Sequence, residues 1–168
     1  MTCSTPGRSL TSRRRLALAI VALWLGTMLF LAFVVPPAVF GSVGRKDAGR
    51  IMARVFPAYY GASILLPLAA LLALGPEAAR SRSARATAAI LASASGLAAV
   101  NAFVIRPRID RLQAVMQSPS GIADAGITAS FARMHVLSVA IIAFLILLAL
   151  AAVVIEVAAS GREDSPPD

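Results

Sequence analysis

The amino-acid sequence predicts an all-α membrane protein: a four-helix transmembrane bundle with an interfacial helix between the third and fourth spans. Two observations lead to this prediction. First, 58% of the 168 residues are apolar and only 14% are charged, which is more apolar surface than a soluble domain of this size can bury. Second, four windows of about 20 residues contain no charge, and each is long enough to cross the hydrocarbon core of a bilayer. Because lipid offers the backbone no hydrogen-bond partners, each window must be a helix.

The four spans are expected at about 16–35, 55–74, 86–105 and 136–155. Helix-breaking prolines or a glycine closely follow the first three windows, and Glu156 follows the fourth. The first window is expected to be a permanent span, because its apolar core is longer than that of a signal peptide. Residues 1–15 are then a basic cytoplasmic tail, 16–158 the transmembrane domain, and 159–168 a disordered polar tail.

The connection between the third and fourth windows is long for a helical bundle. In its sequence RPRIDRLQAVMQ, Ile109, Leu112 and Met116 recur at helical spacing while the charged residues face elsewhere. That pattern is typical of a helix lying in the headgroup layer. We therefore expect the interfacial helix in this connection.

The basic residues lie outside the four windows and divide equally, eight on each side of the membrane. Because the first span usually decides orientation, and Arg13, Arg14 and Arg15 directly precede it, both termini are expected in the cytoplasm. The net charge of +8 indicates contact with anionic lipid headgroups. Nucleic acid is not an expected partner, because no soluble fold is left to carry a basic face.

Three polar residues are expected to meet in one leaflet. Asn101 lies one turn before the end of the third window, and His135 and Ser138 lie at the start of the fourth, on one helix face. Polar side chains in lipid turn toward neighbouring helices, so a hydrogen-bonded cluster is plausible. Two roles stay open for it: a structural contact between helices, which we favour, and a ligand or proton site.

The same side of the membrane carries six arginines that can contact lipid phosphates or hold an anionic ligand. They are Arg50, Arg54, Arg106, Arg108, Arg111 and Arg133. Lipid headgroups are the favoured contact. Arg106 and Asp110 are four residues apart and can form an ion pair.

Small residues predict close helix packing. Ala88, Ala92 and Gly96 recur every four residues in the third window, and Gly26 lies in the first. Small side chains let helix backbones approach one another. We expect these residues to pack within the bundle, with homodimerisation as the alternative.

No constellation for catalysis or for a cofactor is recognisable. One histidine, one cysteine (Cys3) and windows without a carboxylate provide too few ligands for a metal ion or a haem. No Gly-rich phosphate loop is present, and no nucleophile, acid and base occur together. We expect neither a metal, nor a cofactor, nor an enzyme activity.

Several stretches in order resemble a known family. They are LWLGTMLFLAFVVPPAVF, DAGRIMARVFPAYY, NAFVIRPRIDRL and FARMHVLSVA. The series, over roughly residues 16–155, is similar to the family that includes transmembrane protein 205, which in bacteria is the domain of unknown function 4149. The resemblance implies a compact four-helix membrane protein without an established biochemical activity. One position departs from the pattern, because Ile142 replaces an asparagine that the family often carries in its last helix.

Two functional hypotheses follow. The first is a non-enzymatic binding or assembly protein of the bacterial cell membrane, whose partner is lipid, another membrane protein or a second copy of the chain. The alternative is a small transporter, or a protein of solute or metal resistance, that uses the polar side of the bundle. A remote likeness of the first window to copper-resistance membrane proteins falls under this alternative, and the shortage of metal ligands counts against it.

We expect the chain to stay in the membrane fraction after an alkaline carbonate wash and to dissolve only in detergent, because four charge-free windows cannot be kept in water. Ultracentrifugation followed by immunoblotting measures this. Recovery of the chain from the supernatant without detergent would contradict the predicted architecture.

Overall fold

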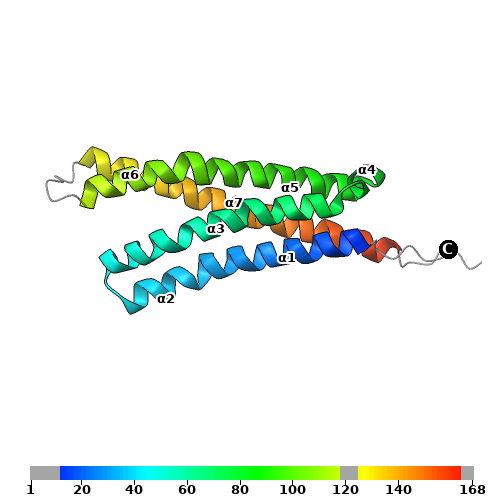
Figure 1. The fold of residues 1–168 in the computed structure, drawn as a ribbon, viewed down its shortest axis with the longest axis horizontal. Helices are drawn as coiled ribbons and strands as arrows, with labels where there is room; N and C mark the ends of the chain where they lie inside the picture. The colour runs from blue at the N-terminus through cyan, green and yellow to red at the C-terminus, as the bar shows by residue number, and fades with distance from the viewer. Residues whose placement is uncertain (1–11, 118–124, 164–168) are drawn as a thin grey trace, which may run out of the picture.

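The computed structural model describes residues 12–117 and 125–163, and all their regular elements are helices (Figure 1). Four helical stretches are long and apolar enough to cross a membrane: Ser12–Ser42, Asp47–Leu74, Arg82–Met116 and Ala125–Ala159. The predicted four-helix membrane architecture is therefore confirmed. In chain order the elements are α1 (Ser12–Phe33), α2 (Val35–Ser42), α3 (Arg45–Leu74), α4 (Glu77–Arg80), α5 (Arg82–Val100), the π-helix η1 (Asn101–Ile105), α6 (Arg106–Gln117) and α7 (Ala125–Glu163).

The long helices form a closed antiparallel arrangement. Helix α3 packs between α1 and α5, and α7 closes the bundle by packing on α5 and α1. The beginning of α1 and the end of α7 lie at the same end of the bundle (Figure 1), which we call the termini end. At the opposite end, the cleft end, the α2–α3 pair and the α6–α7 pair diverge (Figure 1).

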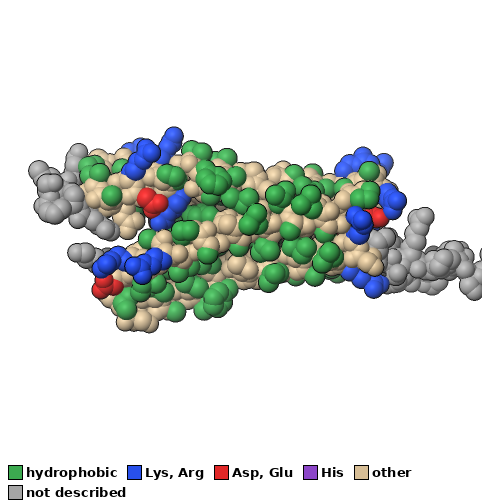
Figure 2. Space-filling model, in the orientation of Figure 1, with side chains coloured by type: hydrophobic (Ala, Val, Ile, Leu, Met, Phe, Trp, Pro, Cys, Tyr) green, Lys and Arg blue, Asp and Glu red, His purple; other side chains and the backbone are tan. Residues whose placement is uncertain are grey.

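The charged side chains mark the membrane boundaries. Figure 2 shows Lys and Arg side chains at both ends and hydrophobic side chains between them. In α7 no charged residue occurs between Arg133 and Glu156, a stretch of about 33 Å at the α-helical rise that matches the hydrocarbon thickness. Since α7 has 39 residues, about 58 Å, it extends past this charge-free stretch at both ends.

The bundle core follows a heptad pattern. Buried residues in α1 alternate at steps of three and four: Arg14, Ala17, Val21, Trp24, Met28 and Leu31. Those of α5 and η1 do the same: Ala84, Thr87, Leu91, Ala94, Ala98, Asn101 and Ile105. This spacing keeps one stripe facing the neighbours and is typical of left-handed helical bundles.

Three of the four small residues expected to pack the helices instead face outward. Ala92, Gly96 and Gly26 are exposed, whereas Ala88 is half-buried, and a Cβ added to Gly26 or Gly96 would meet no atom within 4 Å. That packing prediction does not hold within this chain. Each step of four residues turns about 40° beyond a full helical revolution, so a run of such steps drifts off the stripe that alternating steps keep.

The interfacial helix predicted at the third connection is not confirmed. Helix α6 continues the line of α5 through η1 (Figure 1), and Arg82–Met116 forms one continuous helical stretch. In the π-turn the amide of Arg106 donates to the carbonyl of Asn101, five residues back. The cause is Pro107, which lacks an N–H and whose ring collides with the carbonyl four residues earlier. Widening the turn accommodates the ring without ending the helix.

Helical structure extends into both predicted tails. Helix α1 begins at Ser12 and α7 continues to Glu163, so part of each expected tail is helical. Residues 1–11 and 164–168, with Cys3 among them, lie outside the described residues.

A buried ion pair joins three helices at the termini end. Arg14 of α1 and Glu156 of α7 are 2.8 Å apart (Nη2 to Oε2) and almost completely buried. The Nε of Arg14 donates to the same carboxylate, and Thr87 of α5 donates to its other oxygen at 2.8 Å. The Nη2 of Arg14 also donates to Ser83 Oγ at 3.2 Å. Because a buried charge without a partner is strongly destabilising, this network fixes the relative heights of α1, α5 and α7.

We expect Glu156→Ala to lower the free energy of unfolding by about 3–5 kcal/mol, because it leaves Arg14 charged and buried. Replacing both partners with apolar residues (Arg14→Met with Glu156→Leu) is expected to cost much less. Unfolding in mixed micelles, followed by circular dichroism, measures both effects.

Asp47→Ala is the matched control, since the Asp47–Arg50 pair is long, 3.8 Å, and exposed; it should change stability by less than about 1 kcal/mol. If the single Glu156 variant proved as stable as the double variant, the network would not hold the helices together.

Candidate binding cleft

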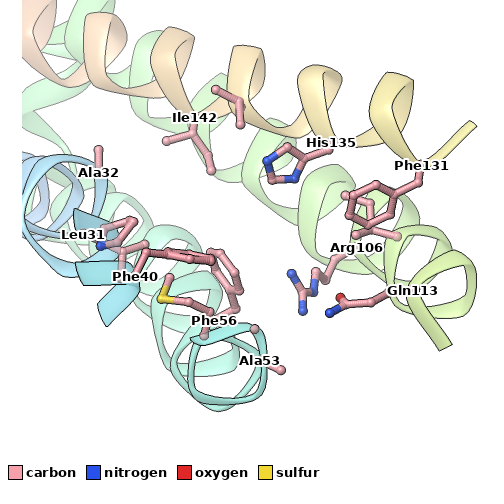
Figure 3. A pocket seen from close by; sticks show the side chains of 15 residues that line it. Leu31, Ala32, Phe40, Ala53, Phe56, Arg106, Gln113, Phe131, His135 and Ile142 are labelled. Atoms are coloured by element: carbon pink, nitrogen blue, oxygen red, sulfur yellow. The ribbon is translucent and has the colours of Figure 1, made fainter. Parts of the chain in front are cut away.

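A cleft of about 400 Å³ opens between the diverging helix pairs. Its walls come from α1 and α2, from α3, from α6 and from α7 (Figure 3). Twelve of the 15 lining residues are apolar or glycine, and Phe40, Phe56 and Phe131 supply three aromatic rings. The three polar lining residues are Arg106, Gln113 and His135. A mostly apolar cavity of this size with a few polar groups is typical of a ligand site.

The cleft is polar toward the membrane surface and apolar toward the membrane centre. Arg106 and His135 lie at the level where charged residues resume, and Gln113 lies two turns farther out along α6. Val139 and Ile142 come six and nine residues after Arg133, about 9 and 13 Å deeper in the membrane. The cleft therefore crosses from the headgroup layer into the hydrocarbon.

The π-turn decides which side chains of α6 face this cleft. The buried residues of the third helix include Asn101 and Ile105. If the alternating spacing of three and four residues continued, the next buried residue would be Arg108, three positions after Ile105. A π-turn adds one residue to the helical turn, so the inward position passes to Ile109, which is buried, while Arg108 is exposed. Gln113, one turn beyond Ile109, then lines the cleft.

Arg106 is held from two sides. Its guanidinium forms a two-point contact with Asp110, at 2.7 Å and 3.1 Å. Its central carbon lies 4.6 Å from the centre of the Phe56 ring, a cation–π geometry that links α6 to α3. The predicted pairing of Arg106 with Asp110 is thus present, and the side chain extends from α6 into the cleft (Figure 3).

His135 extends from α7 into the same cleft (Figure 3). Its imidazole stacks on the Phe131 ring, with centroids 5.8 Å apart and planes at 7°. The imidazole is otherwise open to the cleft, because His135 is an exposed residue. It can therefore meet a ligand without first breaking a contact within the bundle.

The structure separates the three residues of the predicted polar cluster. Asn101 and Ser138 are buried in the bundle, whereas His135 lines the cleft. No hydrogen bond joins the three within the part of the chain that the structure describes. The amide oxygen of Asn101 is buried without a hydrogen-bond partner, as is Trp24 Nε1.

The six predicted arginines occupy the same end of the bundle but play different parts. Arg106 lines the cleft, and Arg54 borders a shallow hollow with Arg50 and Asp47. Arg133 donates to a carbonyl of its own helix at 3.4 Å, and the side chains of Arg108 and Arg111 are exposed. One arginine therefore lies in the site, and the other five lie around it.

Sequence reasoning missed several cleft residues. Phe131 and His135 are four residues apart, a spacing that places two rings on one helix face, so their contact could have been anticipated. Phe56 and Gln113 could not have been anticipated. Phe56 contacts Arg106 on another helix, and Gln113 faces the cleft because of the π-turn.

Together the fold and the cleft define a class: a multi-pass helical membrane protein whose bundle is closed at one end and open at the other. The chain belongs to the family described as domain of unknown function (DUF4149), whose family model matches residues 19–118. An uncharacterized protein of Aquifex aeolicus (strain VF5) is 39% identical over 54 residues, which are 32% of this chain and 41% of that relative. The chain thus matches less than half of that relative's length. No solved structure matches it.

The matched range contributes three walls of the cleft, from α1 to α6. Helix α7, which carries His135, lies beyond it.

We expect Asn101→Leu to raise the free energy of unfolding by about 1 kcal/mol, because it removes a buried acceptor that has no partner. Thermal unfolding in detergent measures the change. Ser138→Ala is the control and should stay within about 0.5 kcal/mol of the parent. A marked loss of stability in Asn101→Leu would show that the amide is satisfied by a group that the leucine displaces.

Proposed function

We propose that this protein is a non-enzymatic integral protein of the cell membrane that binds a membrane lipid in the cleft. The observation that carries the proposal is the position of the cleft across the membrane boundary. Its apolar part lies at hydrocarbon depth, and Arg106, Gln113 and His135 lie at headgroup depth. A lipid in the bilayer already has its headgroup at the surface and its chains toward the centre, so its normal orientation matches the polar-to-apolar order of the cleft.

The charges around the cleft favour an anionic headgroup. At the cleft end the structure describes the side chains of six arginines and of only two aspartates, Asp47 and Asp110. Both aspartates pair with arginines, which leaves an excess of positive charge. Such an excess attracts anionic lipids, by about 1 kcal/mol per residue near the surface, and arginine suits phosphate through paired hydrogen bonds.

The chemistry of the lining supports binding rather than catalysis. No serine, cysteine or carboxylate belongs to the described lining of the cleft. A histidine and an arginine can hold a phosphate, and His135 has no carboxylate beside it in the described lining that would orient or activate it as a nucleophile. The proposal also includes cytoplasmic termini, supported by the arginines before the first span, and kinship with transmembrane protein 205, supported by the order of the family motifs. Self-association is a further part of it.

One observation favours a transporter as the second candidate. The bundle is open at the cleft end and closed at the termini end by the Arg14–Glu156 network. A transporter would alternate this state with one open at the termini end, and that change would have to break the buried pair. If locking the termini end leaves substrate uptake unchanged, transport by this alternation is excluded.

We expect Ala32→Trp to abolish co-purification of lipid, because Ala32 lines the cleft and an indole at this position fills its apolar part. Native mass spectrometry after mild detergent extraction counts the lipids retained per chain. Ala92→Trp serves as the control, since Ala92 is exposed on α5 and lines neither this cleft nor the groove beside it. Equal lipid retention in both variants would refute lipid binding in the cleft.

A further inference from the structure

A second hollow lies beside the cleft, on the lipid-facing side of the bundle. This groove, of about 430 Å³, runs between α3 and the η1–α6 segment. Its walls include Pro57 and Gly61 from α3 and Ala102 and Phe103 from the π-turn. Phe103 is 74% exposed, so the groove opens toward the surrounding bilayer.

The groove and the cleft share a wall. Ala53, Phe56 and Arg106 line both. Across this wall the contact between the Arg106 guanidinium and the Phe56 ring, at 4.6 Å, connects α6 with α3. A rotamer change of either side chain would remove that contact.

Both helices are irregular at the level of this wall. In α3, Pro57 cannot donate to the carbonyl of Ala53, so that turn lacks a helical hydrogen bond. On the other side, η1 is a π-turn that ends at Ile105, directly before Arg106. Prolines and π-turns are the places where helices bend. The boundary between α3 and the η1–α6 segment at this level, which we call the seam, can therefore widen without breaking a regular hydrogen-bond ladder.

We propose that this seam is a lateral opening through which one acyl chain of an anionic phospholipid passes from the bilayer into the cleft. The inference rests on the proposed lipid binding in the cleft. As the seam opens, Arg106 leaves the Phe56 ring and transfers its paired hydrogen bonds from Asp110 to the lipid phosphate.

The dimensions and chemistry of the groove point to an acyl chain as its occupant. The groove extends from the Arg106–Asp110 pair down to Ile64, which comes ten residues after Arg54, about 15 Å along the helix. Its polar end is at headgroup depth, and its remaining walls are apolar or aromatic apart from the phenol of Tyr60. A phospholipid beside the bundle therefore already has its phosphate and its chain at the matching depths.

The test measures lipid exchange in the full chain. Protein reconstituted with phosphatidylglycerol is mixed with vesicles of deuterated phosphatidylglycerol, and native mass spectrometry follows replacement of the bound lipid over time. Gly61→Leu and Ala102→Trp fill the groove, and neither position belongs to the lining of the cleft. We expect both to retain lipid at equilibrium like the parent and to slow exchange at least tenfold.

Gly61 makes the safer variant, because a Cβ added there meets no atom within 4 Å and leucine favours the helix more than glycine. Ala92→Trp is again the control and should exchange at the parental rate. Phe56→Leu keeps an apolar wall but removes the cation–π contact, and it should speed exchange about threefold to tenfold.

The possible failures are distinguishable. If Ala32→Trp still retains lipid, the proposed function falls. If Ala32→Trp loses lipid but Gly61→Leu and Ala102→Trp exchange at the parental rate, lipid binds in the cleft and reaches it by another route, and the lateral opening is wrong.

Discussion

The structure depends on one constraint: the hydrocarbon of the membrane accepts neither an unpaired backbone group nor an unpaired charge. The first half of the constraint makes every span a helix. The second half explains why Arg14 and Glu156, the buried charges of the described bundle, lie against each other at 2.8 Å. Because their partners Thr87 and Ser83 come from α5, satisfying these charges also sets the register of three helices.

The two ends of the bundle differ because the constraint weakens where the hydrocarbon ends. At the termini end Arg14 and Glu156 lie on the buried stripe and pair across helices, while the exposed Glu77–Arg80 pair stays within α4. At the cleft end the described arginines other than Arg106 are exposed, and the described ion pairs stay within one helix, between residues three or four apart. Such pairs do not draw α2–α3 toward α6–α7, so the helix pairs are free to diverge, and apolar residues at membrane depth are left to line a cleft.

The sequence was sufficient for the spans and insufficient for the contacts between them. Charge-free windows fix where a helix crosses lipid, and that prediction is confirmed. Arg14 lay just outside a window and Glu156 just after another, so each could be taken as a boundary residue, and only their placement in three dimensions shows a buried pair. The outward-facing Gly26, Ala92 and Gly96 were misplaced for a related reason: α5 is rich in small residues on every face, so composition does not identify the face that packs.

Pro107 shows how one local conflict shapes the site. A proline was expected to end the third helix, but in the structure the turn before it widens and the helix continues. The widened turn rotates everything after it by one residue, which turns Ile109 and Gln113 inward and Arg108 outward. It also leaves Arg106 at the end of the π-turn, where it reaches Phe56 on α3, borders both hollows and lies at headgroup depth. A regular helix in the same place would carry the same residues but would present Arg108 and Leu112 to the interior. The set of α6 side chains that lines the cleft therefore follows from the backbone response to a single missing N–H, which is why no residue motif alone could reveal it.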